Sequence, residues 1–329
     1  MLYRIGDKIA YPIPIPLYLP MLNQRLLTRI EEKKAKLDSL HPLPPAVVNR
    51  LKEQFTVEWI YNSNAIKGST LTLRETQLIL ETGMTIGGKS LREHFEVINH
   101  KDAIEYVESL ANQGEPITAF HVRQIHKLVL SRIDDENAGQ YGKTQVCIVG
   151  AQHVPPESWD IPHRLAGWEN WLKDSEKNIN PVELAALAHH RLTKIHPFTD
   201  GNGRTAQLVM NLILSCHGYP PAVILRVNRK QYYGVLMQAD SGKTEPLVNF
   251  VGRAVERSLT LYLEAGTPKT KRPLPDEQWI PLAQAADGTP YTQEYLSLLA
   301  RQGRLEAIKR GRVWYTTRKA VKAYQDSVR

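Results

Sequence analysis

The strongest constraint on the fold is a pair of apolar helical patterns that meet at a short polar loop. Residues 181–194 begin with proline and carry apolar side chains at helical spacing, and residues 203–216 repeat that spacing. These patterns predict two buried helices. The nine residues from 196 to 204, at the junction, read HPFTDGNGR. The chain therefore places a glycine-rich polar loop where two core helices meet.

The loop combines the groups needed to bind a chain of phosphates and react with it. Gly201 and Gly203 let the backbone approach a ligand, and a glycine turn that opens a helix presents free N–H groups to anions. Asp200 can hold Mg²⁺ together with phosphate oxygens and water. Arg204 can bridge two phosphate oxygens. His196 is the group of this loop that can accept a proton near neutral pH.

Each of these residues alone is a weak signal. A histidine before a proline is more often a structural loop residue, and a single Gly-x-Gly is usually a turn. A zinc site is disfavoured, because His189 and His190 are adjacent on a helix and cannot share one face, and no cysteine lies near them in sequence. The specific signal is therefore the order of all nine residues.

That order resembles the signature HPFx(D/E)GNGRxxR of the Fic family, whose members transfer AMP from ATP to a Ser, Thr or Tyr hydroxyl of a protein. The resemblance implies a mainly α, Fic-type helical bundle that carries a β-hairpin flap. It also implies that His196 is the general base and that Asp200 holds Mg²⁺. The phosphates would bind to four residues of the loop, Gly201, Asn202, Gly203 and Arg204. Phosphoryl-type transfer depends mostly on positioning and charge neutralisation, which agrees with these residue types.

Residues 139–156 predict a short β-hairpin in an otherwise helical chain, because apolar residues alternate about Gly150. The segment is similar to the family's flap, whose open edge holds the target's backbone by strand pairing. Val146, Ile148 and Gly150 would then dock the target. The alternative is a hairpin without a function.

Residues 55–68 resemble the family's inhibitory helix, with Ser63 and Gly68 at the matching positions. Lys67 stands where the family has a glutamate, and Gln207 replaces the arginine with which that glutamate pairs. Both halves of the ion pair are therefore changed. The hypothesis is that Lys67 binds the nucleotide phosphates, with Gln207 also at the nucleotide site. The alternative is that Lys67 is a solvated surface residue at a helix end.

Two further choices concern the nucleotide. Tyr232 and Tyr233 follow the loop and either stack on adenine or pack in the core. Within the enzyme class, transfer of another nucleotide or of a phosphate is an alternative reaction. Family members that act as kinases carry a lysine near the position of Gly203, and this chain keeps glycine there. AMP transfer is therefore favoured.

Composition predicts a cytoplasmic enzyme with an ordinary core. The 329 residues suffice for more than one domain, and 42% of them are hydrophobic. Four prolines interrupt the first twenty residues, so no signal peptide is expected there, and no apolar run approaches the length of a membrane span. Two cysteines are too few for a disulfide scaffold.

Helical patterns also recur at about residues 20–39, 44–66, 90–112, 117–131, 158–177 and 244–264. We therefore expect a proline-rich arm and a helix over residues 1–43 and a Fic body over residues 44–265. Glycine, prolines and basic residues at 266–276 predict a linker. Residues 277–329 pattern as two helices, a basic hairpin that turns at Arg310 and Gly311, and a last helix. That order resembles a winged helix-turn-helix domain.

Positive charge is concentrated in this last part. From Lys269 to the end, 12 Lys and Arg face 6 Asp and Glu, so the segment supplies six of the chain's eight net positive charges. DNA would be contacted by five basic residues, Arg301, Arg304, Lys309, Arg310 and Arg312. The alternative for this domain is protein docking or homodimerisation. A different function class also stays open, namely a DNA-binding transcriptional regulator whose Fic body senses nucleotide without transferring it.

Overall fold

The computed structural model describes residues 20–40, 45–143, 153–266 and 279–328. Contacts within the chain divide it into two units, Met1–Thr267 and Pro268–Arg329. The predicted linker at 266–276 falls almost wholly outside the described residues, as does most of the predicted proline-rich arm. Each unit is therefore described by itself.

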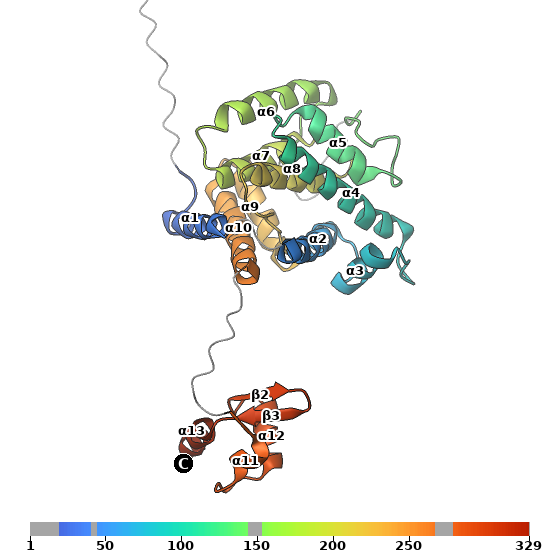
Figure 1. The fold of residues 1–329 in the computed structure, drawn as a ribbon. Coiled ribbons are helices and arrows are strands. Elements are labelled where there is room, and N and C mark those ends of the chain that lie inside the picture. The colour runs from blue at the N-terminus through green and yellow to red at the C-terminus, as the bar shows by residue number, and fades with distance from the viewer. Residues whose placement is uncertain (1–19, 41–44, 144–152, 267–278, 329) are drawn as a thin grey trace, which may run out of the picture. The chain divides into compact units, whose positions relative to one another are not determined.

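The first unit is built from helices (Figure 1). In chain order they are α1 (Gln24–Ser39), α2 (Pro45–Lys67), α3 (Leu73–Thr82), α4 (Leu91–Gln113), α5 (Ala119–Leu130), α6 (Ile161–Ser175), α7 (Pro181–Ile195), α8 (Asn202–Cys216), α9 (Arg229–Asp240) and α10 (Glu245–Gly266). This architecture confirms the predicted mainly α helical bundle.

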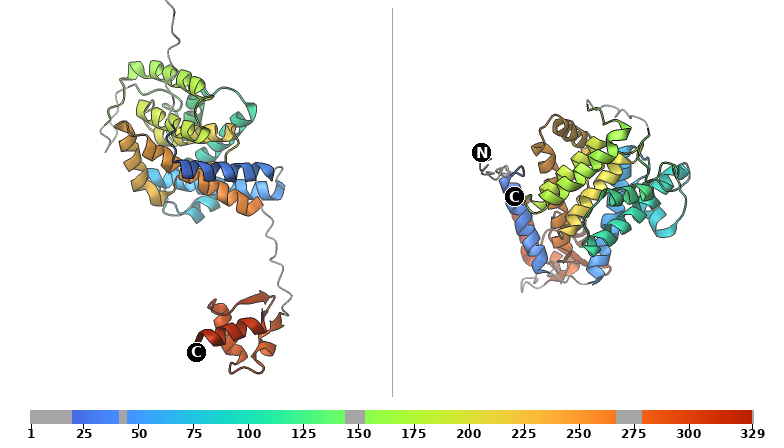
Figure 2. Two further views of the ribbon diagram at one scale, coloured as in Figure 1. Left: turned by 90° about the vertical axis from the view of Figure 1, so that its left-hand side faces the viewer. Right: turned by 90° about the horizontal axis from the view of Figure 1, so that it is seen from above.

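The two helices that flank the signature loop, α7 and α8, lie side by side at the centre of this unit (Figures 1 and 2). Helices α4 and α5 pack against α8, and α6 and α10 pack against α7. Leu208, Met210 and Leu212 of α8 are fully buried. Burying such a side chain contributes roughly 1.5–3 kcal/mol, so both helices are firmly held. The loop between them inherits a fixed position.

The amino-terminal helix α1 is joined to the core by a close approach to α10. A β-carbon at Gly252 of α10 would lie 2.6 Å from Cδ1 of Leu22 and 3.1 Å from Cδ2 of Leu26. The buried carboxylate of Glu183 accepts hydrogen bonds from the backbone N–H groups of Met21 (2.9 Å) and Leu22 (2.6 Å). The start of α1 is thus tied to both α7 and α10.

Two helices of the body, α3 and α9, are missing from the sequence prediction. Helix α3 has only ten residues, and a capping box between Thr72 and Glu75 begins it. Helix α9 contains Gly234 and few buried apolar residues, so its apolar stripe is weak. The main sequence signal for a helix is therefore faint in both segments.

The second unit has a small core and a three-stranded sheet. Its elements are β1 (Ile280–Pro281), α11 (Leu282–Ala286), α12 (Gln293–Arg301), β2 (Ala307–Arg310), β3 (Val313–Thr316) and α13 (Arg318–Val328). The strands are antiparallel in the order β1-β3-β2. Arg310 pairs with Val313, so the hairpin turns at Gly311 and Arg312, one residue later than predicted. The winged helix-turn-helix assignment stays a prediction.

Among the described residues of both units, no helix is both long and apolar enough to cross a membrane.

Candidate functional site

The loop between α7 and α8 is closed by one buried asparagine. Asn202 Oδ1 accepts a hydrogen bond from the backbone N–H of Phe198 (3.0 Å), and Asn202 Nδ2 donates to the carbonyl of Phe198 (2.6 Å). Phe198 is itself buried. The side chain of Asn202 is thus engaged within the loop, which leaves its backbone N–H as the group free to meet a ligand. The loop is shaped before any ligand arrives.

A second side chain that supports the loop, His126 of α5, was not found by sequence reasoning. Its ring stacks on Phe198 with 3.6 Å between centroids. His126 Nδ1 accepts a hydrogen bond from the backbone N–H of Gly139 (3.0 Å), so Nε2 carries the proton and donates to the Asp200 carbonyl (2.9 Å). Burial lowers the pKa of His126 to about 4, which keeps the ring neutral.

The same ring explains one glycine of the signature. Gly201 caps α8 with φ of 78°, and a β-carbon there would lie 3.2 Å from Cδ2 of His126. Both the backbone conformation and the space therefore favour glycine. No side chain caps this helix, so its first N–H groups and the positive end of its dipole are available to an anion.

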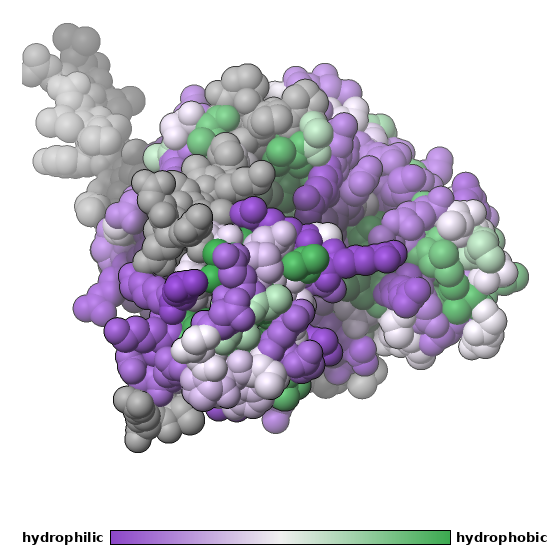
Figure 3. Space-filling model, turned by 60° about the horizontal axis from the view of Figure 1, so that its bottom comes forward, coloured by the Kyte–Doolittle hydropathy of each residue, from purple (hydrophilic) through white to green (hydrophobic). Residues whose placement is uncertain are grey.

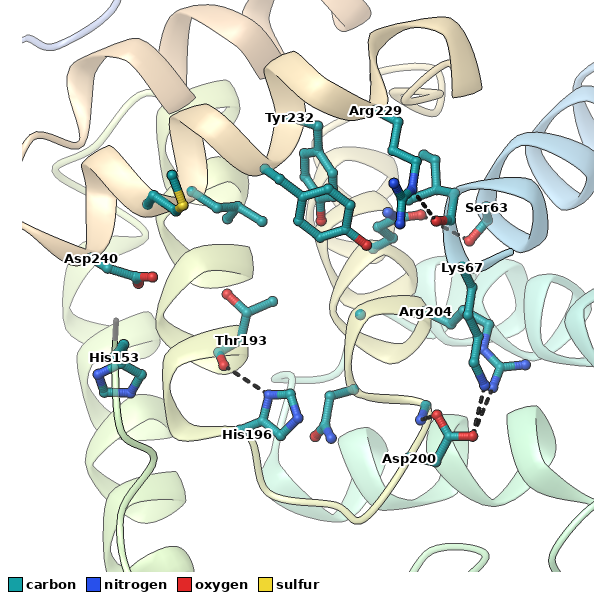
Figure 4. Close-up of a pocket in the computed structure, with 18 of the residues that line it drawn as sticks. Ser63, Lys67, His153, Thr193, His196, Asp200, Arg204, Arg229, Tyr232 and Asp240 are labelled. Carbon is teal, nitrogen blue, oxygen red and sulfur yellow. Dashed lines mark hydrogen bonds and ion pairs between the residues drawn. The ribbon is translucent and has the colours of Figure 1, made fainter. Parts of the chain in front are cut away.

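The predicted base, His196, ends α7 in the left-handed conformation (φ 50°, ψ 57°) and lines the cavity. Its Nδ1 lies 3.4 Å from the Thr193 carbonyl (Figure 4). A carbonyl can only accept, so in the neutral ring Nδ1 carries the proton and Nε2 keeps its lone pair. Burial lowers the pKa of His196, which favours that neutral form at pH 7. The ring is in the state that a general base requires.

A cavity of about 520 Å³ brings the predicted residues together. It extends from Lys67 and Arg204 past His196 to Asp240 (Figure 4), and Tyr233 also lines it. Its volume lies within the range of small-molecule and cofactor sites. All of the signature residues from Thr199 to Arg204 line it, as does Gln207.

The two tyrosines have different positions. Tyr232 is 3% exposed, and its hydroxyl lies 2.9 Å from His189 Nε2, so it forms part of the packed wall. Tyr233 is 42% exposed and lines the cavity, and the Arg229 guanidinium lies over its ring, 5.0 Å from the centroid. Of the two alternatives for this pair, packing describes Tyr232, while stacking of Tyr233 on adenine stays a prediction.

One end of the cavity carries a cationic group that is suited to bind an anionic ligand. Arg204 is 4% exposed, and its Nε and Nη2 atoms have no hydrogen-bond partner among the described residues. Its Nη1 lies 3.4 Å from Oε1 of Glu96, a buried carboxylate that sequence reasoning missed. Leaving buried N–H groups unpaired is costly, so this guanidinium fits a site that receives an anionic ligand.

Lys67 lies inside this site, with its Nζ 2.7 Å from Asp200 Oδ2. The hydrogen bond and charge of Lys67 overcome the effect of burial and lower the pKa of Asp200 to about 2. Burial, with the nearby charge of Arg204, lowers the pKa of Lys67. Close by, Ser63 donates a hydrogen bond to Gln207 Oε1 (2.9 Å). Lys67 and Gln207, the two positions of the replaced ion pair, both line the cavity.

The donor set at this end fits Mg²⁺ better than a zinc-like metal. Among the described residues no group of three or more His, Cys, Asp or Glu side chains could hold a metal ion. His189 and His190 are engaged with Tyr232 and Asp240. A metal at Asp200 would need phosphate oxygens and water as its other ligands, which is how Mg²⁺ is commonly bound.

The predicted flap is anchored beside His196 at both of its described ends. The backbone N–H of Gly142 donates to the Pro197 carbonyl (3.0 Å), and His153 Nε2 lies 2.7 Å from the Lys194 carbonyl. The predicted docking residues Val146, Ile148 and Gly150 lie outside the described residues, so the hairpin and its role stay predictions.

The five candidate DNA contacts lie between the last residue of α12 and the turn of the β2–β3 hairpin in the second unit. Three of their charged groups lie over aromatic rings: Arg304 over Tyr324, Lys309 over Trp314 and Arg310 over Tyr315. Arg301 ends α12 and Arg312 lies in the hairpin turn. DNA binding by this face stays a prediction.

Comparison with known proteins gives the family. The Fic/DOC family profile matches residues 116–214. The chain is 42% identical over 248 residues to a protein adenylyltransferase Fic of Nematostella vectensis, covering 75% of this chain and 57% of the relative. A protein of the same name from Drosophila grimshawi is 39% identical, covering 74% and 50%. The chain thus spans about half the length of the curated relatives it matches.

Solved structures agree in fold as well as in sequence. A Fic domain-containing signaling protein from Bacteroides thetaiotaomicron is 31% identical, with a TM-score of 0.69 over 72% of this chain and 96% of that protein. Fic-1 from C. elegans is 33% identical, with a TM-score of 0.68 over 73% and 72%. With the signature loop, the helical core around it and these relatives in agreement, the chain belongs to the Fic/DOC family.

Proposed function

We propose that this chain is a protein adenylyltransferase, which moves AMP from ATP to a Ser, Thr or Tyr hydroxyl of another protein or of the chain itself. The names of the similar curated proteins support this reaction. The observation that carries the proposal is a neutral His196 in the same cavity as a buried Arg204 that lacks hydrogen-bond partners. A base and an anion site in one cavity are the two requirements of the transfer.

In the reaction the target hydroxyl donates a hydrogen bond to Nε2 of His196. As its oxygen forms a bond to the α-phosphorus, the bond from that phosphorus to the bridging oxygen of the leaving pyrophosphate breaks, and the proton passes to Nε2. Arg204 and the N–H groups at the start of α8 stabilise the charge on the phosphates. Mg²⁺ held by Asp200 would neutralise further phosphate charge.

The nucleotide would lie along the cavity with its phosphates at the α8 end. Gly203 has no atom within 4 Å of the place where its β-carbon would be, so the backbone there is open to a phosphate. Tyr233 would stack on adenine at the rim, while Tyr232 supports the wall. Lys67 would contact the phosphates, with Gln207 beside it.

The test is incubation of the full chain with α-labelled ATP and Mg²⁺, alone and with lysate proteins. His196→Ala should reduce incorporation of label by about 10²–10⁴-fold, because no other group would accept the hydroxyl proton. His217→Ala at the far end of α8, outside the cavity, is the matched control and should keep full activity. Label that survives loss of His196 would remove the assigned base.

Partners beyond the nucleotide are also proposals. A target protein would dock at the flap beside His196, and the same chain would form a homodimer. Exposed apolar side chains of α3, of the connection that follows it and of the start of α4 offer a surface for such a contact, namely Leu73, Leu78, Met84 and Leu91. A hydrophobic patch is visible on the right of the face drawn in Figure 3.

A cytoplasmic location stays a prediction.

A further inference from the structure

Five charged side chains from three segments converge beside the anion-binding end of the cavity, which Lys67, Asp200 and Arg204 line. Lys67 ends α2, Arg92 and Glu96 lie on α4, and Asp200 and Arg204 belong to the signature loop and the start of α8. Asp200 Oδ2 lies 2.7 Å from Lys67 Nζ, 2.9 Å from Arg92 Nη2 and 3.9 Å from Arg204 Nη2. Two cations from outside the signature thus share one oxygen of the predicted metal ligand.

The buried carboxylate of Glu96 organises the same three cations. Its Oε1 lies 3.6 Å from Lys67 Nζ, 3.6 Å from Arg92 Nε and 3.4 Å from Arg204 Nη1. Glu96 is 6% exposed, and its charge holds the cations on one side of the cavity. Three positive and two negative groups leave an excess of one positive charge before any ligand binds. The arrangement is therefore complementary to a polyanion.

We propose that Lys67 and Arg92 form a clamp for the terminal phosphates of a nucleoside triphosphate, and that in the free protein this clamp occupies Asp200. This inference rests on the proposed function for the identity of the ligand. A triphosphate offers several oxygens to the two cations, whereas Asp200 offers them one. When the cations move to the phosphates, Asp200 Oδ2 becomes available to a metal ion. Triphosphate binding therefore promotes metal binding at Asp200, and each promotes the other.

A purely structural role explains these contacts less well. The Arg92 side chain is 54% exposed, and a solvent-exposed ion pair contributes little to stability. Asp200 is already neutralised by Lys67, so a second close cation is not required to hold it. Arg92 instead places a half-exposed guanidinium against Asp200, near a buried Arg204 whose Nε and Nη2 lack hydrogen-bond partners among the described residues. Glu96 acts through these cations as a positioning residue.

The first measurement separates the terminal phosphates from the rest of the nucleotide. Isothermal titration calorimetry in EDTA gives the affinity of the full chain for ATP and for AMP without metal. Lys67→Ala and Arg92→Ala should each weaken ATP binding by about tenfold, as loss of a charge-assisted hydrogen bond predicts. AMP binding should be unchanged, because AMP lacks the phosphates that the clamp contacts.

The second measurement has the opposite expected sign. Mn²⁺ alone, followed by its effect on the relaxation of water protons, should bind both variants more tightly than the wild type, because Asp200 has lost a competing cation. Lys101→Ala is the matched control, since Lys101 lies on the same helix as Arg92 and pairs with Glu105. It should change neither affinity. General damage to the fold would weaken the binding of both ATP and Mn²⁺ and cannot produce opposite changes in the two affinities.

The clamp is refuted if ATP binding is unchanged, if ATP and AMP lose affinity in parallel, or if Mn²⁺ alone binds the variants no more tightly. It is supported if the variants bind ATP more weakly, bind AMP as the wild type does and bind Mn²⁺ more tightly. These readouts need no catalysis, so they are independent of the labelling assay with His196→Ala. A protein that discriminates ATP from AMP through Lys67 and Arg92 without transferring label would keep the clamp and lose the transferase proposal.

Discussion

At the scale of single residues, the shape of the signature loop depends on buried side chains that need not touch the substrate. Asn202 joins both polar backbone groups of Phe198, and His126 stacks on that ring while it holds the Asp200 carbonyl. Each of these groups is buried and paired, so loss of one leaves its partner unsatisfied. The position of His196 and Asp200 is therefore set by residues beneath them.

Replacing Asn202 tests this dependence. Asn202→Ala leaves the N–H and carbonyl of Phe198 without partners and should lower the free energy of unfolding by about 1–3 kcal/mol. Urea unfolding followed by circular dichroism measures the change. Asn178→Ala is the control, because its amide donates to the Asp174 carbonyl in an exposed position. Equal urea midpoints for the two variants would show that the hydrogen bonds between Asn202 and Phe198 do not stabilise the loop.

Sequence reasoning reached one half of the site more easily than the other. His196, Asp200 and Arg204 stand in one loop, so a single motif names them together. Lys67 was found because a second motif of the resembled family marks its position. Arg92 and Glu96 belong to no motif, and α4 buries polar residues among apolar ones, so its pattern does not mark a functional face. The packing of α4 against α8 is what brings them to Asp200 and Arg204.

At the scale of elements, most helices were predictable, whereas α3, α9 and β1 were not. The apolar stripe of α10 follows helical spacing and matches its buried residues, whereas α7 and α8 are buried at nearly every position. Helix α3 begins with a capping box instead, and β1 has two residues that become a strand by pairing with β3. Such elements depend on caps or distant partners, which periodicity does not reveal.

The contact between α1 and α10 gives a prediction at this scale. Gly252→Ala places a methyl group against buried Leu22 and Leu26 and should lower the free energy of unfolding by about 1–3 kcal/mol. Thermal and urea unfolding measure the change. Gly167→Ala is the matched helical control, because its β-carbon would meet nothing within 4 Å, and it should raise stability by about 0.5–1 kcal/mol. A neutral Gly252 variant would mean that α1 moves freely to make room.

At the scale of the whole molecule, buried neutral histidines make folding sensitive to acid. Burial lowers the pKa of His100 and His189 to about 3 and that of His126 to about 4. All three are essentially fully buried in the helical body. An unfolded chain takes up protons on these rings near pH 6.5, whereas the folded chain does not. Their contribution to stability is complete above that pH and is lost as the pH falls.

The loss should be visible between pH 7 and pH 5. Below pH 6.5 each ring should lower the free energy of unfolding by about 1.4 kcal/mol per pH unit, until the pH approaches the pKa of that ring in the folded chain. The free energy of unfolding, taken from urea titrations at pH 7, 6 and 5, measures the slope. His100→Gln should reduce the slope by about 1.4 kcal/mol per pH unit. Stability that does not change over this range would contradict the neutral, buried state of the three rings.

The two hydrogen bonds that hold the ends of the flap beside His196 have a consequence for evolution. Gly142 and His153 bind the carbonyls of Pro197 and Lys194, which lie close to His196 in the chain. Under the docking role proposed for the flap, substitutions between Gly142 and His153 would alter which proteins are recognised while these two hydrogen bonds persist. Target choice would then diverge between descendants of this chain without a change in the chemistry.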